Sequence, residues 1–262
     1  MLLGTPLSTP FPLHPLDDDA IASLERATLD AVAPPALQEI DGWLLPFDTS
    51  TIGRAKSAVP LRHDHIDTAL VKTIEDRYAA RGLQAAYRVA DVPGLAGMQA
   101  ELVRLGYQPQ QPTLVQIGSV LAMRQFRPGT PGNLSLVPTP AWSAVYLAEG
   151  FDPIDGAHRV QALSRSPHVV YAWIEEGGQS VAAGTAAFSQ GWASIHGMRT
   201  LPQHRGKGLA GRLLATLADA AMERGLERVF LQVEESNTAA LALYQRAGFT
   251  PAWHYHYWRK DG

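Results

Sequence analysis

The sequence has no cysteine at all, and this absence excludes several kinds of chemistry at once. Without a thiol there is no disulfide scaffold, no thiolate metal site, no iron–sulfur cluster and no cysteine nucleophile. Residues 1–16 contain no lysine or arginine, and prolines interrupt their apolar positions, so we expect no signal peptide. No apolar run reaches the length of about 18 residues that a membrane span requires. The lack of cysteine does not fix the compartment, but the other two absences favour a cytoplasmic protein.

The excess of one sign of charge over the other is also small. The 22 lysines and arginines against 25 aspartates and glutamates leave a net charge of −3 over 262 residues. Such a surface has no general attraction for nucleic acid or for an anionic membrane, and we expect neither as a partner. Hydrophobic residues make up 46% of the chain and charged residues 18%, a balance that excludes global disorder.

Apolar strand patterns and amphipathic helix patterns alternate along the chain, which predicts a mixed α/β (α+β) fold. Residues 127–133 are rich in proline and glycine, so we expect a domain at 1–126, a linker at 127–133 and a second domain at 134–262. The second half echoes the first. Arg-Gly-Leu at 224–226 repeats 81–83 at an offset of 143 residues, and Gly248 repeats Gly106 at 142, which indicates an internal duplication.

The most informative segment is the turn between a predicted strand at 192–200 and a predicted helix at 207–224. Gly206 and Gly208 lie where the helix begins, so backbone N–H groups converge there with no side chain to block an approaching phosphate. No acidic residue occurs between 177 and 218, although four basic residues do: Arg199, Arg205, Lys207 and Arg212. The turn therefore predicts a cationic phosphate site.

The turn admits three other interpretations. A plain helix start with a solvated basic face is disfavoured, because each glycine in the first turn weakens a helix by about 0.5–1 kcal/mol. A P-loop requires glycine five residues before Gly206, where Leu201 stands. Residues 206–211 do fit the dinucleotide pattern G-x-G-x-x-G, with Glu234 as the ribose-binding acid. However, only 28 residues follow Glu234 (262 − 234), too few to complete a doubly wound sheet.

Residues 205–210 resemble the signature of the GNAT superfamily of acyl-CoA-dependent N-acetyltransferases, Arg/Gln-x-x-Gly-x-Gly/Ala. Asn237 after the next strand, Tyr244 seven residues later, and Gly248 with Phe249 also match the family in order and spacing. The resemblance is specific over about 192–249 and looser over the rest of the second half.

The resemblance implies two tandem GNAT-like domains, each a mixed, mostly antiparallel sheet flanked by helices, with a splayed strand pair in the second. The first domain is expected to be degenerate. By the same offsets, Asp64 stands where the second half has Lys207, and Leu102 stands where it has Tyr244. An acid at the first position would repel a phosphate, so only the second domain is expected to bind acetyl-CoA.

The site residues implied by the resemblance follow by position. Main-chain groups of six residues would hold the pyrophosphate: Arg205, Gly206, Lys207, Gly208, Leu209 and Ala210. Met198, Arg199 and Thr200 would pair with the pantetheine arm, and Asn237 would hydrogen-bond to it. A backbone N–H near Met198 would face the thioester oxygen. Tyr244 would donate a proton to the leaving sulfur.

The general base is less clearly marked. His196 stands where many relatives have a glutamate, and a histidine ordinarily titrates in the right range. The alternative is a hydrogen-bonded strand histidine with water relaying the proton, and Glu234 and Glu235 are further candidates. His254 and His256 share one strand face but have no third ligand, so we expect no metal. Trp253, Tyr255 and Tyr257, on the other face, are expected to form a wall of the acceptor pocket.

The resulting prediction is an acetyl-CoA-dependent N-acetyltransferase. A primary amine, on a small molecule or at a peptide or protein N-terminus, would attack the thioester directly. The alternative is a non-catalytic sensor that binds acyl-CoA without turnover. The sequence leaves the oligomeric state open between monomer and homodimer.

Overall fold

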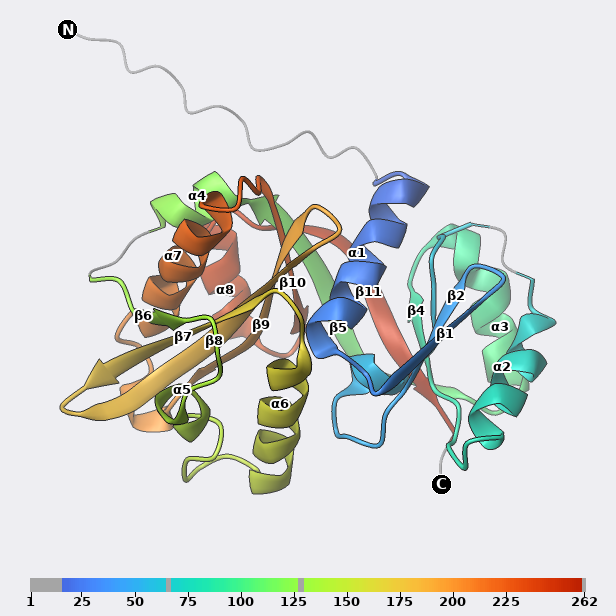
Figure 1. Ribbon diagram of the computed structural model, residues 1–262. Coiled ribbons are helices and arrows are strands. Elements are labelled where there is room, and N and C mark those ends of the chain that lie inside the picture. The colour runs from blue at the N-terminus through green and yellow to red at the C-terminus, as the bar shows by residue number, and fades with distance from the viewer. Residues whose placement is uncertain (1–15, 65–66, 127–129, 261–262) are drawn as a thin grey trace, which may run out of the picture.

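The computed structural model describes residues 16–64, 67–126 and 130–260, and contains two sheets (Figure 1). The smaller sheet is an antiparallel meander whose strands are β1 (Ala36–Ile40), β2 (Trp43–Phe47) and β3 (Val59–Pro60). The larger sheet has eight strands in the order β4 (Tyr87–Ala90), β11 (Thr250–Arg259), β5 (Gln108–Ser119), β10 (Arg228–Glu234), β9 (Trp192–Thr200), β8 (Gln179–Ser189), β7 (Val169–Glu176) and β6 (Asn133–Ser135).

The helices that pack around the sheets are α1 (Asp18–Val32), α2 (Leu70–Ala79), α3 (Ala96–Arg104), α4 (Val120–Gln125), α5 (Pro140–Ala144), α6 (Pro153–Arg165), α7 (Leu209–Met222) and α8 (Thr238–Arg246). Short 3₁₀ turns are η1 (Gly53–Lys56), η2 (Pro93–Leu95) and η3 (Pro202–His204). Helix α7 packs on β7, β8 and β9, whereas α1 packs on β8, β9 and α6. Among the described helices, none has both the length and the hydropathy needed to cross a bilayer.

Local sequence explains where several of these elements begin. The side chain of Asp17 accepts a hydrogen bond from the Ala20 N–H at 2.8 Å, so the expected N-cap of α1 is confirmed. Asn237 caps α8 in the same way, through the Ala240 N–H at 3.2 Å. Gly177 and Gly178 both have positive φ and form the expected turn between β7 and β8.

The same arrangement of strands occurs in both halves. Ala58, directly before β3, forms a single parallel bridge with Tyr87 of β4, and β9 meets β10 in parallel in the second half. The chain then continues through α3 to β5 in the first half and through α8 to β11 in the second. This repetition supports the predicted duplication, and the pairing is mixed and mostly antiparallel, as expected for the fold class.

The last strands of the two halves are exchanged. Strand β5 of the first half pairs with β10 of the second, and β11 of the second half lies between β4 and β5 of the first. Four aromatic side chains of β11 consequently pack in the hydrophobic core of the first half: Trp253, Tyr255, Tyr257 and Trp258. Each half therefore needs the other to complete its sheet.

The expected boundary at 127–133 stays a prediction, and three of its residues, 127–129, lie outside the described residues. The chain does pass from α4 to β6 across this segment. Because the eight-stranded sheet continues from one half into the other, a cut there would separate β5 from β10 and β11 from β4.

We predict that fragments 1–126 and 127–262, expressed separately, will not fold. Without β11 the first fragment exposes the edges of β4 and β5 and loses aromatic core residues, each worth about 3–5 kcal/mol. Circular dichroism and urea titration of each fragment will check this, with the co-expressed pair as the control. A cooperative unfolding transition in either fragment alone would contradict the prediction.

Candidate active site

Strands β9 and β10 diverge after a short parallel contact. They pair only at Ala193–Val229, Ser194–Phe230 and Ile195–Leu231. Beyond this point β9 stays on β8 as far as Thr200, while β10 stays on β5 as far as Glu234. A pocket of about 360 Å³ opens between the two strands. The structure thus contains the splayed strand pair that the sequence predicted.

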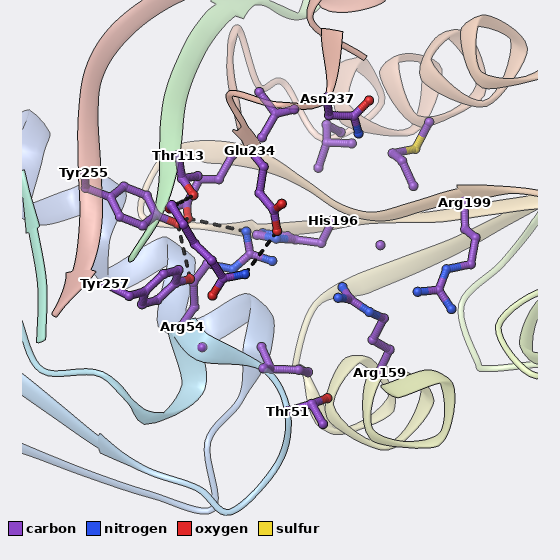
Figure 2. Close-up of a pocket in the computed structure, with 18 of the residues that line it drawn as sticks. Thr51, Arg54, Thr113, Arg159, His196, Arg199, Glu234, Asn237, Tyr255 and Tyr257 are labelled. Carbon is purple, nitrogen blue, oxygen red and sulfur yellow. Dashed lines mark hydrogen bonds between the residues drawn. The ribbon is translucent and has the colours of Figure 1, made fainter. Parts of the chain in front are cut away.

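Both halves of the chain contribute to the walls of this pocket (Figure 2). The second half supplies β9 from Ile195 to Arg199, the end of β10, the start of α8, and Arg159 of α6. The first half supplies residues 51–54 around η1, together with Gln111 and Thr113 of β5. The exchanged strand β11 adds Tyr255 and Tyr257, so these two tyrosines form a wall of the pocket.

A β-bulge interrupts β9 where it borders the pocket. The register with β8 shifts so that Gly184 faces both Gly197 and Met198. Gly197 has φ +63°, and the hydroxyl of Tyr146 donates a hydrogen bond to its carbonyl at 2.7 Å. A Cβ at Gly184 would lie 2.5 Å from the Met198 sulfur, so a larger residue opposite the bulge would displace the Met198 side chain. Met198 therefore stands where the strand ladder is broken, at the position expected to supply an oxyanion donor.

The start of α7 has the features expected of a phosphate seat. Gly206 and Gly208 have φ of +77° and +74°, and no side chain caps the first turn of the helix. Arg205 and Lys207 are exposed beside the glycines. The residues present fit a bound pyrophosphate, because uncapped N–H groups at a helix N-terminus favour an anion.

The turn is less cationic than the sequence suggested. The side chain of Arg212 donates to the Thr130 carbonyl at 2.6 Å, and that of Arg199 forms an ion pair with Asp155 at 3.0 Å. Glu176, just outside the acid-free segment, lies 2.9 Å from His204 and 3.7 Å from Lys207. The sequence did not indicate this contact because Glu176 is far from the turn along the chain, and only the fold places the end of β7 beside the turn. Main-chain donors must therefore carry more of the binding than side-chain charge does.

His196 lies deep in the pocket. Its side chain is buried, and neither ring nitrogen has a hydrogen-bond partner among the described residues. Burial, aided by the positive charge of Arg54, holds the pKa of His196 well below 6.5. The expectation that it titrates near neutral pH is therefore wrong, since a dry environment disfavours the imidazolium. At neutral pH His196 is an uncharged base with unoccupied nitrogens.

Asn237, the N-cap of α8, and Tyr244 within that helix also line the pocket. Tyr244 is buried against Phe249, and burial raises its pKa to about 12, so its hydroxyl keeps its proton at neutral pH. The side-chain oxygen of Asn237 caps α8, which leaves its amide N–H groups as donors.

Residues 137–249 match the family described as Acetyltransferase (GNAT) family. This half of the chain belongs to the GNAT acetyltransferases. A mycothiol acetyltransferase from Salinispora arenicola is 29% identical over 212 residues, which cover 72% of this chain and 66% of that protein. The chain spans 49% to 66% of the length of the first four curated relatives that it matches.

Solved structures extend the likeness in fold to nearly the whole chain. A GCN5-related N-acetyltransferase from Kribbella flavida superimposes with a TM-score of 0.68 at 17% identity, covering 92% of this chain and 96% of that one. A tandem GNAT protein from the clavulanic acid biosynthesis pathway gives a TM-score of 0.58 at 17% identity, covering 96% and 89%. The predicted tandem GNAT fold is confirmed.

The other residues named as candidates are dispersed. Glu234 lines the pocket of the GNAT half, and Gln111 donates to its carboxylate at 3.2 Å. Glu235 instead pairs with His254, so this histidine contacts a carboxylate and not His256. Among the described residues, no group of histidine and carboxylate side chains is arranged to hold a metal ion.

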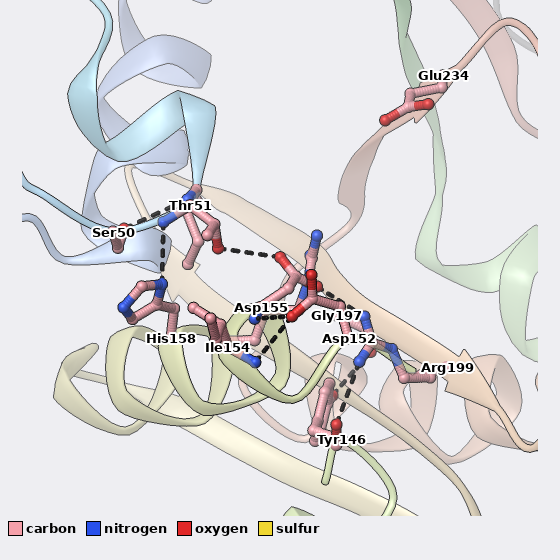
Figure 3. Close-up of polar contacts among 12 residues, drawn as sticks. Ser50, Thr51, Tyr146, Asp152, Ile154, Asp155, His158, Gly197, Arg199 and Glu234 are labelled. Atoms are coloured by element: carbon pink, nitrogen blue, oxygen red, sulfur yellow. Dashed lines mark hydrogen bonds and ion pairs between the residues drawn. The ribbon is translucent and has the colours of Figure 1, made fainter. Parts of the chain in front are cut away.

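A polar cluster joins the GNAT half to the first half beside the pocket (Figure 3). Thr51 donates from its hydroxyl to Asp155 at 3.0 Å and from its backbone N–H to His158 at 3.2 Å. Asp155 also accepts from Arg159 at 2.6 Å and from Arg199 at 3.0 Å. Burial alone would raise the pKa of Asp155, but these donors lower it, so it remains a carboxylate.

Sequence reasoning missed Arg54, Thr51 and Gln232. Arg54 and Thr51 belong to no motif, and only the fold brings them to the pocket. Gln232 did carry a signal, because it is a polar residue inside the otherwise apolar strand 229–233.

The buried histidine predicts a loss of stability in mild acid. Unfolded histidine takes up a proton below about pH 6.5, whereas folded His196 resists it, so stability is complete above this pH and falls below it. His63, with its pKa lowered to about 4 by burial, adds a loss of the same sign between about 6.5 and 4.

As the pH falls from about 6.5 to 5, the unfolding free energy of wild type should therefore decrease by about 1–2 kcal/mol more than that of the His196→Gln variant. Urea titrations across this range measure the difference. His168→Asn, at an exposed position with φ +55°, is the control and should follow wild type. Equal slopes for wild type and His196→Gln would refute the prediction.

Proposed function

We propose that this protein is an acetyl-CoA-dependent N-acetyltransferase that transfers an acetyl group to a primary amine. The observation that carries the proposal is the divergence of β9 and β10. This divergence opens a pocket lined by His196 and Tyr244, and β9, which borders that pocket, leads through η3 to the uncapped start of α7. Membership of the second half in the GNAT family supports the reaction type, because GNAT enzymes use acetyl-CoA as the donor.

The donor site proposed here lies entirely in the GNAT half. Main-chain N–H groups of residues 205–210 bind the pyrophosphate, the main chain at 198–200 pairs with the pantetheine arm, and Asn237 donates to that arm. Acetyl-CoA supplies an activated acetyl group on a sulfur that can leave. The backbone N–H near Met198 donates to the acyl oxygen, an interaction whose loss typically reduces a rate about 10²–10³-fold.

His196 and Tyr244 divide the proton transfers in this proposal. A neutral His196 accepts the proton that the attacking amine must lose, directly or through a water molecule. Tyr244 donates its hydroxyl proton to the departing sulfur. The low pKa of His196 and the raised pKa of Tyr244 keep each in the required protonation state at neutral pH.

The first half is proposed to shape the acceptor side of the pocket. It has no glycine-rich turn where the GNAT half has one, yet Thr51, Arg54 and Gln111 line the pocket. This division assigns the donor to residues 134–262 and part of the acceptor site to residues 1–126.

We predict that Tyr244→Phe will lower kcat for acetyl transfer about 100-fold or more, with KM for acetyl-CoA changed less than about threefold, because only the proton donor is lost. The assay is amine-dependent release of free thiol from acetyl-CoA, screened over a panel of amines. Tyr171→Phe, which removes a buried hydroxyl bonded to the Leu163 carbonyl, is the matched control and should retain kcat. If no amine accelerates thiol release in wild type, the protein binds acyl-CoA without transferring the acetyl group.

We predict that Gly206→Asp will weaken acetyl-CoA binding at least about 10-fold, because a carboxylate would face the pyrophosphate. Gly225→Asp is the control at the other end of α7. Both glycines have positive φ (+77° and +69°), and a Cβ at either would meet no atom within 4 Å. The two substitutions therefore introduce similar strain. Calorimetric titration with acetyl-CoA measures the affinity of both variants. Equal affinities would show that the α7 turn does not bind the pyrophosphate.

A further inference from the structure

Arg54 enters the pocket at the end farthest from the proposed donor site. Figure 2 shows Arg54, Tyr255 and Tyr257 gathered at this end, Asn237 and Arg199 at the opposite end, and His196 between them. We call the group formed by Arg54, Gln232, Tyr255 and Tyr257 the arginine recess. It combines a residue of the first half with residues of β10 and β11.

The guanidinium of Arg54 forms few polar interactions with the described residues. Its hydrogen bond within the described chain is a long one, to the side-chain oxygen of Gln232 at 3.4 Å. A guanidinium presents a planar fork of N–H donors that matches the two oxygens of a carboxylate. Arg54 is half-buried and lines the pocket, and it forms no hydrogen bond to a carboxylate among the described residues, so the guanidinium is available to a ligand there.

The acids near the recess have other partners, and Glu234, which also lines the pocket, accepts a hydrogen bond from the Gln111 side chain at 3.2 Å. Glu25 is fully buried and forms an ion pair with Arg88 at 2.5 Å. Asp155 forms ion pairs with Arg159 and Arg199, the other two arginines that line the pocket. Asp48 forms an ion pair with Arg165 at 3.1 Å. In the parts of the chain that the structure describes, no carboxylate forms an ion pair with Arg54.

The remaining groups of the recess are uncharged and held in place by contacts within the protein. Gln232 donates its amide N–H to Thr28 at 3.0 Å, which turns its oxygen toward Arg54 and the Tyr255 hydroxyl. The ring of Tyr257 rests on Gly53, where a Cβ would lie 2.8 Å from ring atoms. The recess thus has a fixed shape and a positive charge that forms no ion pair with a carboxylate among the described residues, although Glu25 lies within the reach of its field.

We propose that the acceptor carries a carboxylate that binds Arg54, so that the acetylated amine belongs to a free amino acid or a small molecule built like one. This inference rests on the proposed acetyl transfer and adds the substrate class. A simple amine arrives as a cation and would be repelled by Arg54, whereas the carboxylate of an amino acid cancels that repulsion. With its carboxylate in the recess, the amine faces His196 toward the donor end of the pocket.

The first experiment compares acceptors in the wild-type protein. The common L-amino acids are assayed beside their carboxamides and decarboxylated amines, by release of free thiol from acetyl-CoA. We expect at least one amino acid to be acetylated with a kcat/KM about 100-fold above its carboxamide, since a site that pairs a charge rejects analogues lacking it. Equal rates for an acid and its amide, or preference for the amine, would overturn the proposal.

The second experiment removes the arginine. Arg54→Gln should lower kcat/KM for the preferred amino acid about 100-fold, mainly through KM, and its carboxamide less than about threefold. KM for acetyl-CoA should not change. Arg54→Lys should recover part of the activity, because it keeps the charge without the fork. Arg77→Gln, at an exposed position on α2, is the charge-matched control and should behave as wild type. Retained preference for the acid in Arg54→Gln would overturn the role of Arg54.

A binding measurement separates this proposal from the proposed function. Thermal shift with the same amino acids and amides, in the presence of CoA, reports the recess without turnover. Stabilisation by acids but not amides that disappears in Arg54→Gln supports the recess even if no acetyl transfer is detected, in which case only the transferase assignment fails. Acetylation of amines without any such stabilisation or acid preference keeps the transferase and refutes the recess. Absence of both effects across the panel refutes the recess as well.

Discussion

The ladder between β5 and β10 determines the shape of the pocket. Strand β10 is held along its whole length by β5, a strand of the first half, whereas β9 is held by β8. Because two neighbours direct these strands separately, their parallel contact ends after Ile195 and Leu231. The bulge at Gly197 and Met198 then bends β9 further from β10. The cleft of the GNAT half is thus kept open by a strand from the half that lacks the glycine-rich turn.

Dry surroundings in this cleft act on two side chains in complementary ways. Burial disfavours charge, so it lowers the pKa of a histidine and raises that of a tyrosine. His196 is thereby kept as a free base and Tyr244 as a free acid over the same pH range. A cavity that holds an uncharged base apart from an uncharged acid can accept a proton at one position and deliver another elsewhere, with the cation and the anion so formed leaving its net charge unchanged.

Much of the GNAT half could be predicted from sequence because its signals are local. The strand at 192–200 has the predicted bounds, and the caps at Asp17 and Asn237 follow from side chains adjacent to the helix start. The exchange of β5 and β11 could not be predicted, since both strands have apolar faces that suit either neighbour. Arg54 was missed for the same reason, because its place in the pocket depends on that exchange.

The position of β11 also bears on how the molecule is made. This strand lies between β4 and β5, although the ribosome synthesises it after every other described strand. Until it emerges, the nascent first half has a gap in its sheet and unpaired strand edges on both sides of that gap. Strands β4 and β5 therefore gain the neighbour that lies between them only near the end of synthesis, and the insertion of β11 completes this part of the sheet.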